Sequence, residues 1–99
     1  MTKLIIWSPL SETDLEVILE YLAEDWNGKV AIRFLDKIEH LLEQISINPE
    51  QFPLVNKKRK VRKCVITRHN TIFYRENEGY VEVLRIFDTR QDPKRLKYE

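Results

Sequence analysis

The chain has 99 residues, which fit one domain and leave no room for two. With 42% hydrophobic residues, 33% charged residues, two glycines and four prolines, its composition excludes disorder and collagen-like repeats. Cys64 is the only cysteine, so no internal disulfide is possible, and the apolar run Leu4–Trp7 is too short for a signal peptide or a membrane span. We therefore expect one domain over residues 1–99, a cytoplasmic location and no membrane partner.

The net charge of +1 conceals a marked asymmetry along the chain. Residues before Lys57 include 4 Lys/Arg and 10 Asp/Glu, whereas the remainder includes 13 and 6, which gives net charges of −6 and +7. Residues 57–75 hold eight of these cations and no acidic residue. This run predicts binding to a polyanion or to an acidic partner. The alternatives are that the two halves neutralise each other across the fold, or that the run solvates a loop.

A strand followed by a helix is predicted at the start of the chain. The β-leaning run Lys3–Trp7 leads into Ser8-Pro9, a capping serine followed by a proline suited to a first helical turn. Ser11 and Asp14 form a second capping-type signal. Apolar residues then recur with helical spacing at Leu15, Ile18, Leu19, Leu22 and Trp26, which predicts a helix to about Asp25.

A second, more amphipathic helix is predicted after a break at Asn27-Gly28. Its apolar positions repeat with helical spacing from Val30 to Ile45, and Asn48-Pro49 closes the pattern. A link of two or three residues predicts an antiparallel helical hairpin. Residues 50–60 show no clear period, so we expect a loop there.

The rest of the chain has the alternation and composition of strands. The predicted strands are Val61–Thr67, Thr71–Glu76 and Tyr80–Asp88, separated by breaks at residues 68–70 and 77–79. Asp92-Pro93 ends the last strand, and residues 93–99 form a short polar tail with room for one helical turn. The order β-α-α-β-β-β predicts a two-layer α+β fold in which the N-terminal helical hairpin packs on an antiparallel sheet.

The sequence lacks the common signatures of cofactor and metal chemistry. It has no Gly-rich nucleotide-binding motif and no pair of cysteines, and its only histidines are His40 and His69. We therefore expect no cofactor and no metal. His40 fits an exposed or flanking position of the second helix, and Cys64 fits a small buried apolar side chain. Aromatic residues on the predicted core stripes need no ligand to explain them: Trp7, Trp26, Phe34, Phe73 and Tyr74.

Cleavage of an RNA phosphodiester without a metal is the most plausible enzymatic activity. It needs cations on the phosphate and groups that move protons to and from the reacting oxygens. Arg62 and Arg90 are candidate cations, and histidine is the side chain that most readily exchanges a proton near neutral pH, which makes His69 a candidate. Alternation places Arg62 on the same strand face as Cys64 and Ile66, with Val61, Lys63 and Val65 on the other.

Four residues that could serve a site, Arg85, Arg90, His69 and Tyr98, also have a structural explanation. Arg85 lies in the apolar run Leu84–Phe87, where it either pairs with an acid or faces a site. Arg90 either serves a site or is neutralised by Asp88 or Asp92. His69 fits a solvated turn, and Tyr98 lies in the polar tail.

The order of elements and three segments resemble the RelE/ParE toxin superfamily of type II toxin-antitoxin systems. The segments are "IIWSPLSETDLEVILEYLAEDW", "VRKCVITRHNTIFYRENEGYVEVLRIF" and the closing "FDTRQDP". The resemblance spans nearly the whole chain and implies a small sheet with a helical pair on one face. It also implies an antitoxin partner and one of two activities: ribosome-dependent cleavage of mRNA, or inhibition of DNA gyrase by a ParE-like toxin.

The ribonuclease pattern of this superfamily matches the chain only in part. Arg62 and Arg90 fall on two of its basic positions, whereas the other positions fall on Cys64, near Thr71 and near Leu96. The resemblance therefore favours a ParE-like gyrase inhibitor, with a ribonuclease and a non-toxic interaction module as alternatives. For a nuclease the predicted catalytic residues are Arg62, His69 and Arg90. The predicted target-binding residues are Arg59, Lys60, Arg62, Arg68, Arg85, Arg90 and Tyr98, and the predicted targets are gyrase or ribosome-bound mRNA.

Overall fold

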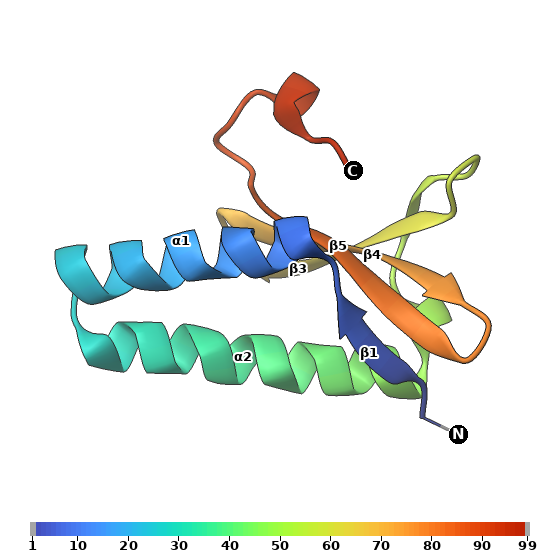
Figure 1. Cartoon of the computed structure of the whole chain (residues 1–99), viewed down its shortest axis with the longest axis horizontal. Coiled ribbons are helices and arrows are strands. Elements are labelled where there is room, and N and C mark those ends of the chain that lie inside the picture. The colour runs from blue at the N-terminus through green and yellow to red at the C-terminus, as the bar shows by residue number, and fades with distance from the viewer. Residues whose placement is uncertain (1, 99) are drawn as a thin grey trace.

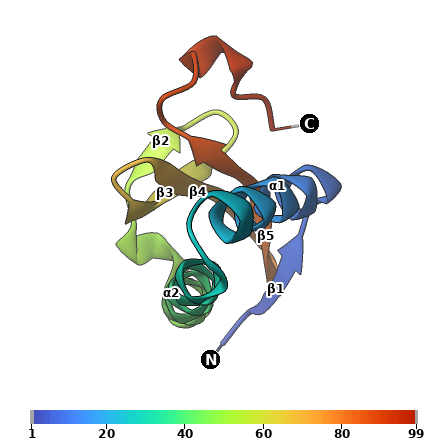
Figure 2. The ribbon, with the colours of Figure 1, turned by 90° about the vertical axis from the view of Figure 1, so that its left-hand side faces the viewer.

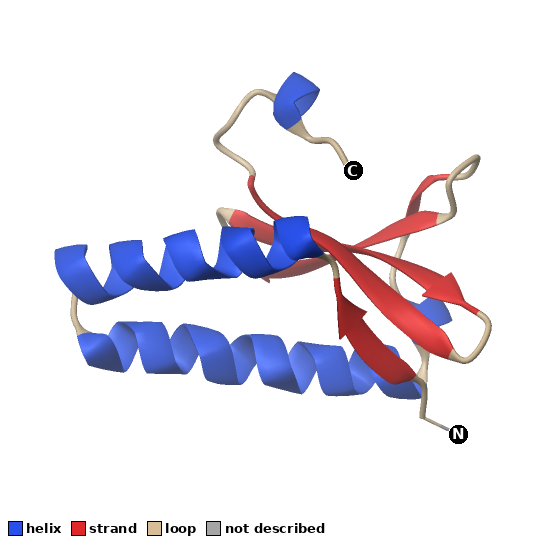
Figure 3. Ribbon diagram, viewed as in Figure 1, coloured by secondary structure: helices blue, strands red, loops and turns tan. Residues whose placement is uncertain are grey.

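The computed structural model describes residues 2–98, so the predicted tail is described only as far as Tyr98, and Met1 and Glu99 lie outside the described residues. Strand β1 (Leu4–Trp7) precedes the helices α1 (Pro9–Asp25) and α2 (Gly28–Ile47). Strands β2 (Leu54–Asn56), β3 (Val61–Thr67), β4 (Asn70–Asn77) and β5 (Tyr80–Asp88) follow, with single 3-10 turns at η1 (Pro49–Gln51) and η2 (Pro93–Arg95). Figures 1 and 3 show the two helices side by side against the sheet.

Both long helices begin at capped residues. The Ser8 side chain accepts a hydrogen bond of 3.1 Å from the backbone N–H of Ser11, and the Asn27 side chain accepts one of the same length from Val30. These bonds satisfy helix N–H groups that have no partner within the helix. The second capping signal predicted at Ser11 and Asp14 is wrong, because both residues lie inside α1. The Ser11 hydroxyl instead donates to the carbonyl of Ser8 at 2.8 Å, and the Asp14 carboxylate pairs with Arg85 of β5.

The sheet has the strand order β1-β5-β4-β3-β2. The predicted α+β fold with a helical hairpin on one side of the sheet is confirmed, but the sheet is mixed, because β1 pairs with β5 in parallel. The predicted loop over residues 50–60 is also wrong in part. It contains η1 and β2, and β2 pairs with the start of β3 across a tight turn at residues 57–60. Three residues are too few to show a period of two in the sequence.

A bulge in β5 decides which side chains face the helices. Phe73 pairs with Arg85 while Tyr74 pairs with Val83, so Leu84 and Arg85 together oppose one residue of β4. A bulge of this kind shifts the alternation of the strand by one residue. Val81 and Val83 before it therefore face the helices, and so does Ile86 after it.

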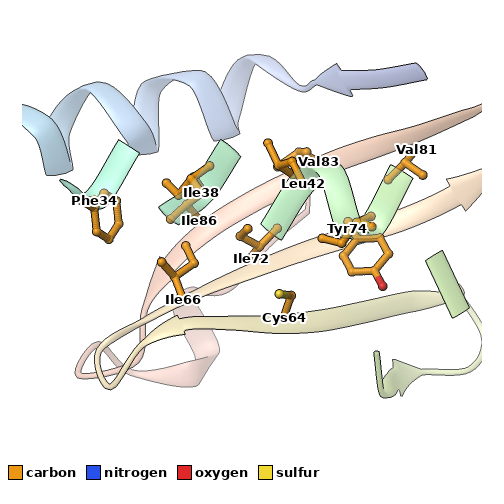
Figure 4. Close-up of a cluster of buried hydrophobic side chains, with 11 residues drawn as sticks. Phe34, Ile38, Leu42, Cys64, Ile66, Ile72, Tyr74, Val81, Val83 and Ile86 are labelled. Atoms are coloured by element: carbon orange, nitrogen blue, oxygen red, sulfur yellow. The ribbon is translucent and has the colours of Figure 1, made fainter. Parts of the chain in front are cut away.

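The larger core lies between the helices and the sheet, as Figure 4 shows. Its most deeply buried members include Ile38 and Ile45 of α2 and Ile72 and Tyr74 of β4, each with essentially no exposed surface. The Tyr74 hydroxyl donates a 2.5 Å hydrogen bond to the carbonyl of Pro49, which ties η1 to the sheet. This core accounts for the apolar stripe predicted on the second helix.

A smaller core lies on the opposite face of the sheet. Val61, Phe73, Leu84 and Phe87 are buried there, and Leu96 and Tyr98 of the tail pack against them. Figure 2 shows the tail crossing over the sheet on the side away from α2. Trp26 is absent from both cores and is 66% exposed, so its predicted core position is wrong. It follows the last residue of α1 at the free end of the hairpin, where the helices extend past the sheet (Figure 1).

Candidate functional site

Arg62 lies on the helix-facing side of β3, on the face that the alternation predicted. Cys64 and Ile66 of the same face are buried in the larger core, while Lys63 and Val65 are exposed. The Arg62 guanidinium donates to the main-chain carbonyl of Phe52 at 2.7 Å and to that of Glu50 at 3.3 Å. It thus holds the segment between η1 and β2 against the sheet.

His69 and Arg90 lie together in a different place, a groove at the free end of the helical hairpin. We call it the helix-tip groove: it has a volume of about 460 Å³. Its lining comes from both helices, the β3–β4 turn and the residues after β5: Tyr21, Leu22, Trp26, Val30, Arg33, Phe34, Lys37, Thr67, His69, Asn70 and Arg90. The floor is aromatic and aliphatic, and the charged groups on the rim are cations.

Arg90 is paired with Asp88, which is one of the two alternatives that the sequence predicts for it. Its Nε and Nη2 donate to the two carboxylate oxygens of Asp88 at 3.0 and 2.8 Å. The guanidinium hydrogen bonds hold the pKa of Asp88 below its ordinary value of 3.8, and the same contact raises the pKa of Arg90. Asp88 fixes the direction of the guanidinium but leaves it half exposed.

Arg85 likewise has an acidic partner. Its Nε and Nη2 donate to the carboxylate of Asp14 at 2.7 and 2.9 Å, and this carboxylate also accepts the backbone N–H of Ile86 at 3.0 Å. The hydrogen bond to Asp14 is the main cause of a raised pKa at Arg85. Beyond Val83, β5 has no pairing with β1, so Asp14 satisfies a backbone donor on this edge of the sheet.

The tail and the β2–β3 turn meet on the far face of the sheet. The Tyr98 ring lies 6.1 Å from that of Phe73, and the Arg59 guanidinium carbon lies 5.4 Å from the Tyr98 ring centre. Arg85 also donates to the carbonyl of Lys97 at 2.8 Å. Tyr98 and Arg59, both predicted to bind a target, therefore join the tail to the turn.

Lys60 and Arg68, the two remaining residues predicted to bind a target, lie at opposite ends of β3. Lys60 is exposed in the β2–β3 turn, where it adopts the left-handed region with φ of 57°. Arg68 is exposed in the β3–β4 turn, and its carbonyl accepts a bond from the Thr89 hydroxyl. The predicted target-binding residues thus do not share one surface. Arg90 lines the helix-tip groove, Arg62 holds the segment before β2, and Arg59 and Tyr98 lie where the tail meets the β2–β3 turn. No finding tests their roles, which stay predictions.

Cys64 and His40 lie where the sequence predicted. Cys64 is 1% exposed, and burial raises the pKa of its thiol to about 11. His40 is exposed on α2 beside Gln44, with 3.1 Å between the side-chain nitrogens. Within residues 2–98, no three His, Cys, Asp or Glu side chains are grouped as metal ligands. No helix in this part of the chain is long and apolar enough to cross a membrane.

Four residues of the helix-tip groove escaped the sequence prediction. Tyr21, Trp26, Arg33 and Lys37 line it, whereas the sequence pattern predicts a core position for Trp26 and no site role for the other three. Trp26 stands at the end of its helical stripe, directly before the Asn27-Gly28 break. An aromatic residue at a hairpin tip is the signal that could have indicated an exposed apolar surface.

Comparison with known proteins identifies the fold and the family. The family described as ParE toxin of type II toxin-antitoxin system, parDE, matches residues 5–93. A solved chain described as chromosomal ParDE TA system from P. aeruginosa has a TM-score of 0.74 at 16% identity, over 88% of this chain and 96% of that chain. Comparison with curated proteins gives no match. The helical hairpin on a small mixed sheet is thus the fold of a type II toxin. The chain belongs to the ParE toxin family, as its resemblance predicted.

Proposed function

We propose that this chain arrests growth by binding DNA gyrase rather than by cutting RNA. The family match supports a toxin, and one observation favours binding over cleavage. Arg62 lies on the helix-facing side of β3 and donates to two main-chain carbonyls, whereas His69 and Arg90 line the helix-tip groove. Phosphodiester cleavage needs its cations and its proton-transfer groups around one phosphate.

The gyrase proposal is tested by adding the purified chain to bacterial DNA gyrase and relaxed plasmid. We expect loss of supercoiling at toxin concentrations that leave relaxation by topoisomerase I unchanged. The second enzyme is the control, because a cationic protein that merely coats DNA inhibits both. Equal inhibition of the two enzymes, or no inhibition of gyrase, would contradict the proposal.

An antitoxin is the partner that we propose for the helix-tip groove. The similar ParE-fold chain comes from a ParDE TA system, which supports a partner of this kind. The lining of the groove combines apolar side chains with the cations Arg33 and Lys37 and with Arg90, which is paired with Asp88, and it includes no acidic residue. Such a surface fits a peptide segment with apolar anchors and acidic flanks.

Charge reversal at the rim tests this assignment. We expect Arg33→Glu with Lys37→Glu to weaken antitoxin binding at least tenfold in calorimetry. The control is Lys29→Glu, which changes an exposed cation of the same helix that does not line the groove. If the double variant binds the antitoxin as the wild type does, the antitoxin lies elsewhere on the toxin.

The ribonuclease alternative keeps one observation in its favour, the shared groove of His69 and Arg90. It predicts new mRNA 5′ ends within translated frames soon after the chain is induced without antitoxin, and their loss in a His69→Ala, Arg90→Ala variant. Growth arrest without such ends supports the gyrase proposal. Absence of both arrest and cleavage would indicate a non-toxic interaction module.

A further inference from the structure

The β2–β3 turn and the tail present exposed cations around a hollow that both segments line, and we call this surface the cationic ridge. The exposed residues Lys58, Lys94, Arg95 and Lys97 make up the ridge. Arg59 and Tyr98 join its two parts by a cation–π contact at 5.4 Å. Figure 2 shows the tail on the side of the sheet away from α2, and the contact between Arg59 and Tyr98 brings the end of the tail to the turn.

The ridge is held in a defined shape by contacts on both of its sides. In the turn, the Asn56 side chain accepts the backbone N–H of Arg59 at 2.9 Å. In the tail, Tyr98 packs on Phe73, and the Lys97 carbonyl accepts from Arg85 at 2.8 Å. The cations are therefore displayed from ordered backbone, which reduces the conformational entropy that is lost when a ligand binds.

The surroundings of the ridge favour an anionic ligand. A hollow of about 500 Å³ between the turn and the tail is lined by Asn56, Arg59, Pro93, Leu96, Lys97 and Tyr98, with no acidic residue among them. Two acids flank the tail in sequence, Asp92 and Glu99. The Asp92 carboxylate accepts the backbone N–H of Lys94 at 3.0 Å. On the other side of the turn, Glu50, Glu76 and Glu78 line a separate groove with Lys57 and Lys60.

The ridge differs in character from the helix-tip groove. A peptide partner needs free apolar anchors, which the groove provides. At the ridge, Leu96 and Tyr98 are already packed against the smaller core. A single-stranded nucleic acid gains most from aromatic rings on which its bases stack. The aromatic ring of the ridge, Tyr98, is held between Phe73 and Arg59. Exposed cations whose apolar and aromatic neighbours are engaged by the fold suit a regular array of phosphates, and duplex DNA carries phosphates at high density.

We propose that the cationic ridge binds the phosphate backbone of double-stranded DNA, independently of base sequence. The charge distribution favours binding with the ridge toward the DNA and the helices away from it, since residues 8–48 of the helical layer include nine Asp/Glu and three Lys/Arg. The acidic layer would be repelled by DNA, and the ridge would face it. This proposal goes beyond gyrase inhibition and does not depend on it.

The test is fluorescence anisotropy of the full chain with a labelled duplex of about 20 base pairs and no gyrase present. Four phosphate contacts predict a slope of about −3.6 for log K against log salt, or roughly 150-fold weaker binding between about 50 and 200 mM NaCl. The variant Lys58→Gln, Lys94→Gln, Lys97→Gln should lower the slope to about −1. All three side chains are exposed, and a thermal unfolding curve checks that this variant is folded.

The matched control is Lys29→Gln, Arg33→Gln, Lys37→Gln, which removes the same charge from exposed positions on α2. It should keep the wild-type salt slope. An equal loss in both variants would show an effect of net charge alone and overturn the proposal, as would no binding of the wild type at low salt. The duplex assignment is wrong if a single strand of equal length binds as tightly. If polyglutamate displaces DNA at equal charge concentration, the ridge is instead a surface for acidic proteins.

Discussion

The Asp14 carboxylate holds α1 against the edge of β5, and its removal should destabilise the fold. This carboxylate accepts three hydrogen bonds, two from Arg85 and one from the backbone N–H of Ile86. The side chains of Asp14 and Arg85 are 16% and 18% exposed. Breaking a fully buried pair costs about 3–5 kcal/mol, and the partial exposure here lowers that cost to about 2 kcal/mol. The unpaired N–H of Ile86 adds about 1 kcal/mol, so Asp14→Ala should lose about 3 kcal/mol.

Urea unfolding followed by circular dichroism measures this loss as a lower midpoint at unchanged slope. Asp14→Asn should lose less, about 1–2 kcal/mol, because its amide oxygen can still accept from Ile86. A double-mutant cycle with Arg85→Met should give a coupling energy of about 1–2 kcal/mol between the two side chains. A loss below about 0.5 kcal/mol for Asp14→Ala, within the range of ordinary surface substitutions, would refute the inference that this carboxylate closes the edge of β5.

Three further predictions follow from single contacts. Arg90 holds the pKa of Asp88 below 3.8, so the stability from this contact is present at neutral pH and is lost as the pH falls through the lowered pKa. The variant Arg90→Gln should raise the pKa of the Asp88 carboxyl in an NMR titration, and an unchanged titration would contradict the pairing. Because burial raises the pKa of Cys64 to about 11, a disulfide reagent at pH 8 should react at least tenfold more slowly with the folded chain than with the urea-unfolded chain. Tyr98→Ala removes the ring contacts to Phe73 and Arg59 and should cost about 1–2 kcal/mol, or roughly 4–15 °C in Tm; Tyr98→Phe, which keeps the ring, should stay within about 0.5 kcal/mol.

The regular elements could be predicted because each is long enough to show its period. The cap at Ser8, the break at Asn27-Gly28 and the strands β3, β4 and β5 lie at or within a few residues of their predicted positions. The parallel pairing of β1 could not be predicted, because its partner strand β5 begins 76 residues after Leu4 and no local pattern indicates which strands pair. The bulge at Leu84 and Arg85 was also invisible, since it changes the alternation without any glycine or proline to mark it.

The candidate site was harder to predict than the fold. Residue type identified the cations correctly as a group, but their roles depend on partners that lie far away in sequence. Arg85 meets Asp14, 71 positions earlier, while Arg62 meets the carbonyl of Phe52 across β2. Whether an arginine is held by the fold or free to meet a ligand is decided by such distant contacts, which a local pattern does not contain.

The pairing of β1 with β5 has a consequence for the order in which the chain folds. Leu4 pairs with Tyr80, 76 positions later, whereas the helical hairpin and the β3–β4–β5 meander are built from neighbours in sequence. Contacts over long separations form late because loop closure is costly in entropy. During synthesis, β1 has no strand to pair with until almost the whole chain has emerged. The edge of the sheet should therefore close last, after the helices and the meander have formed.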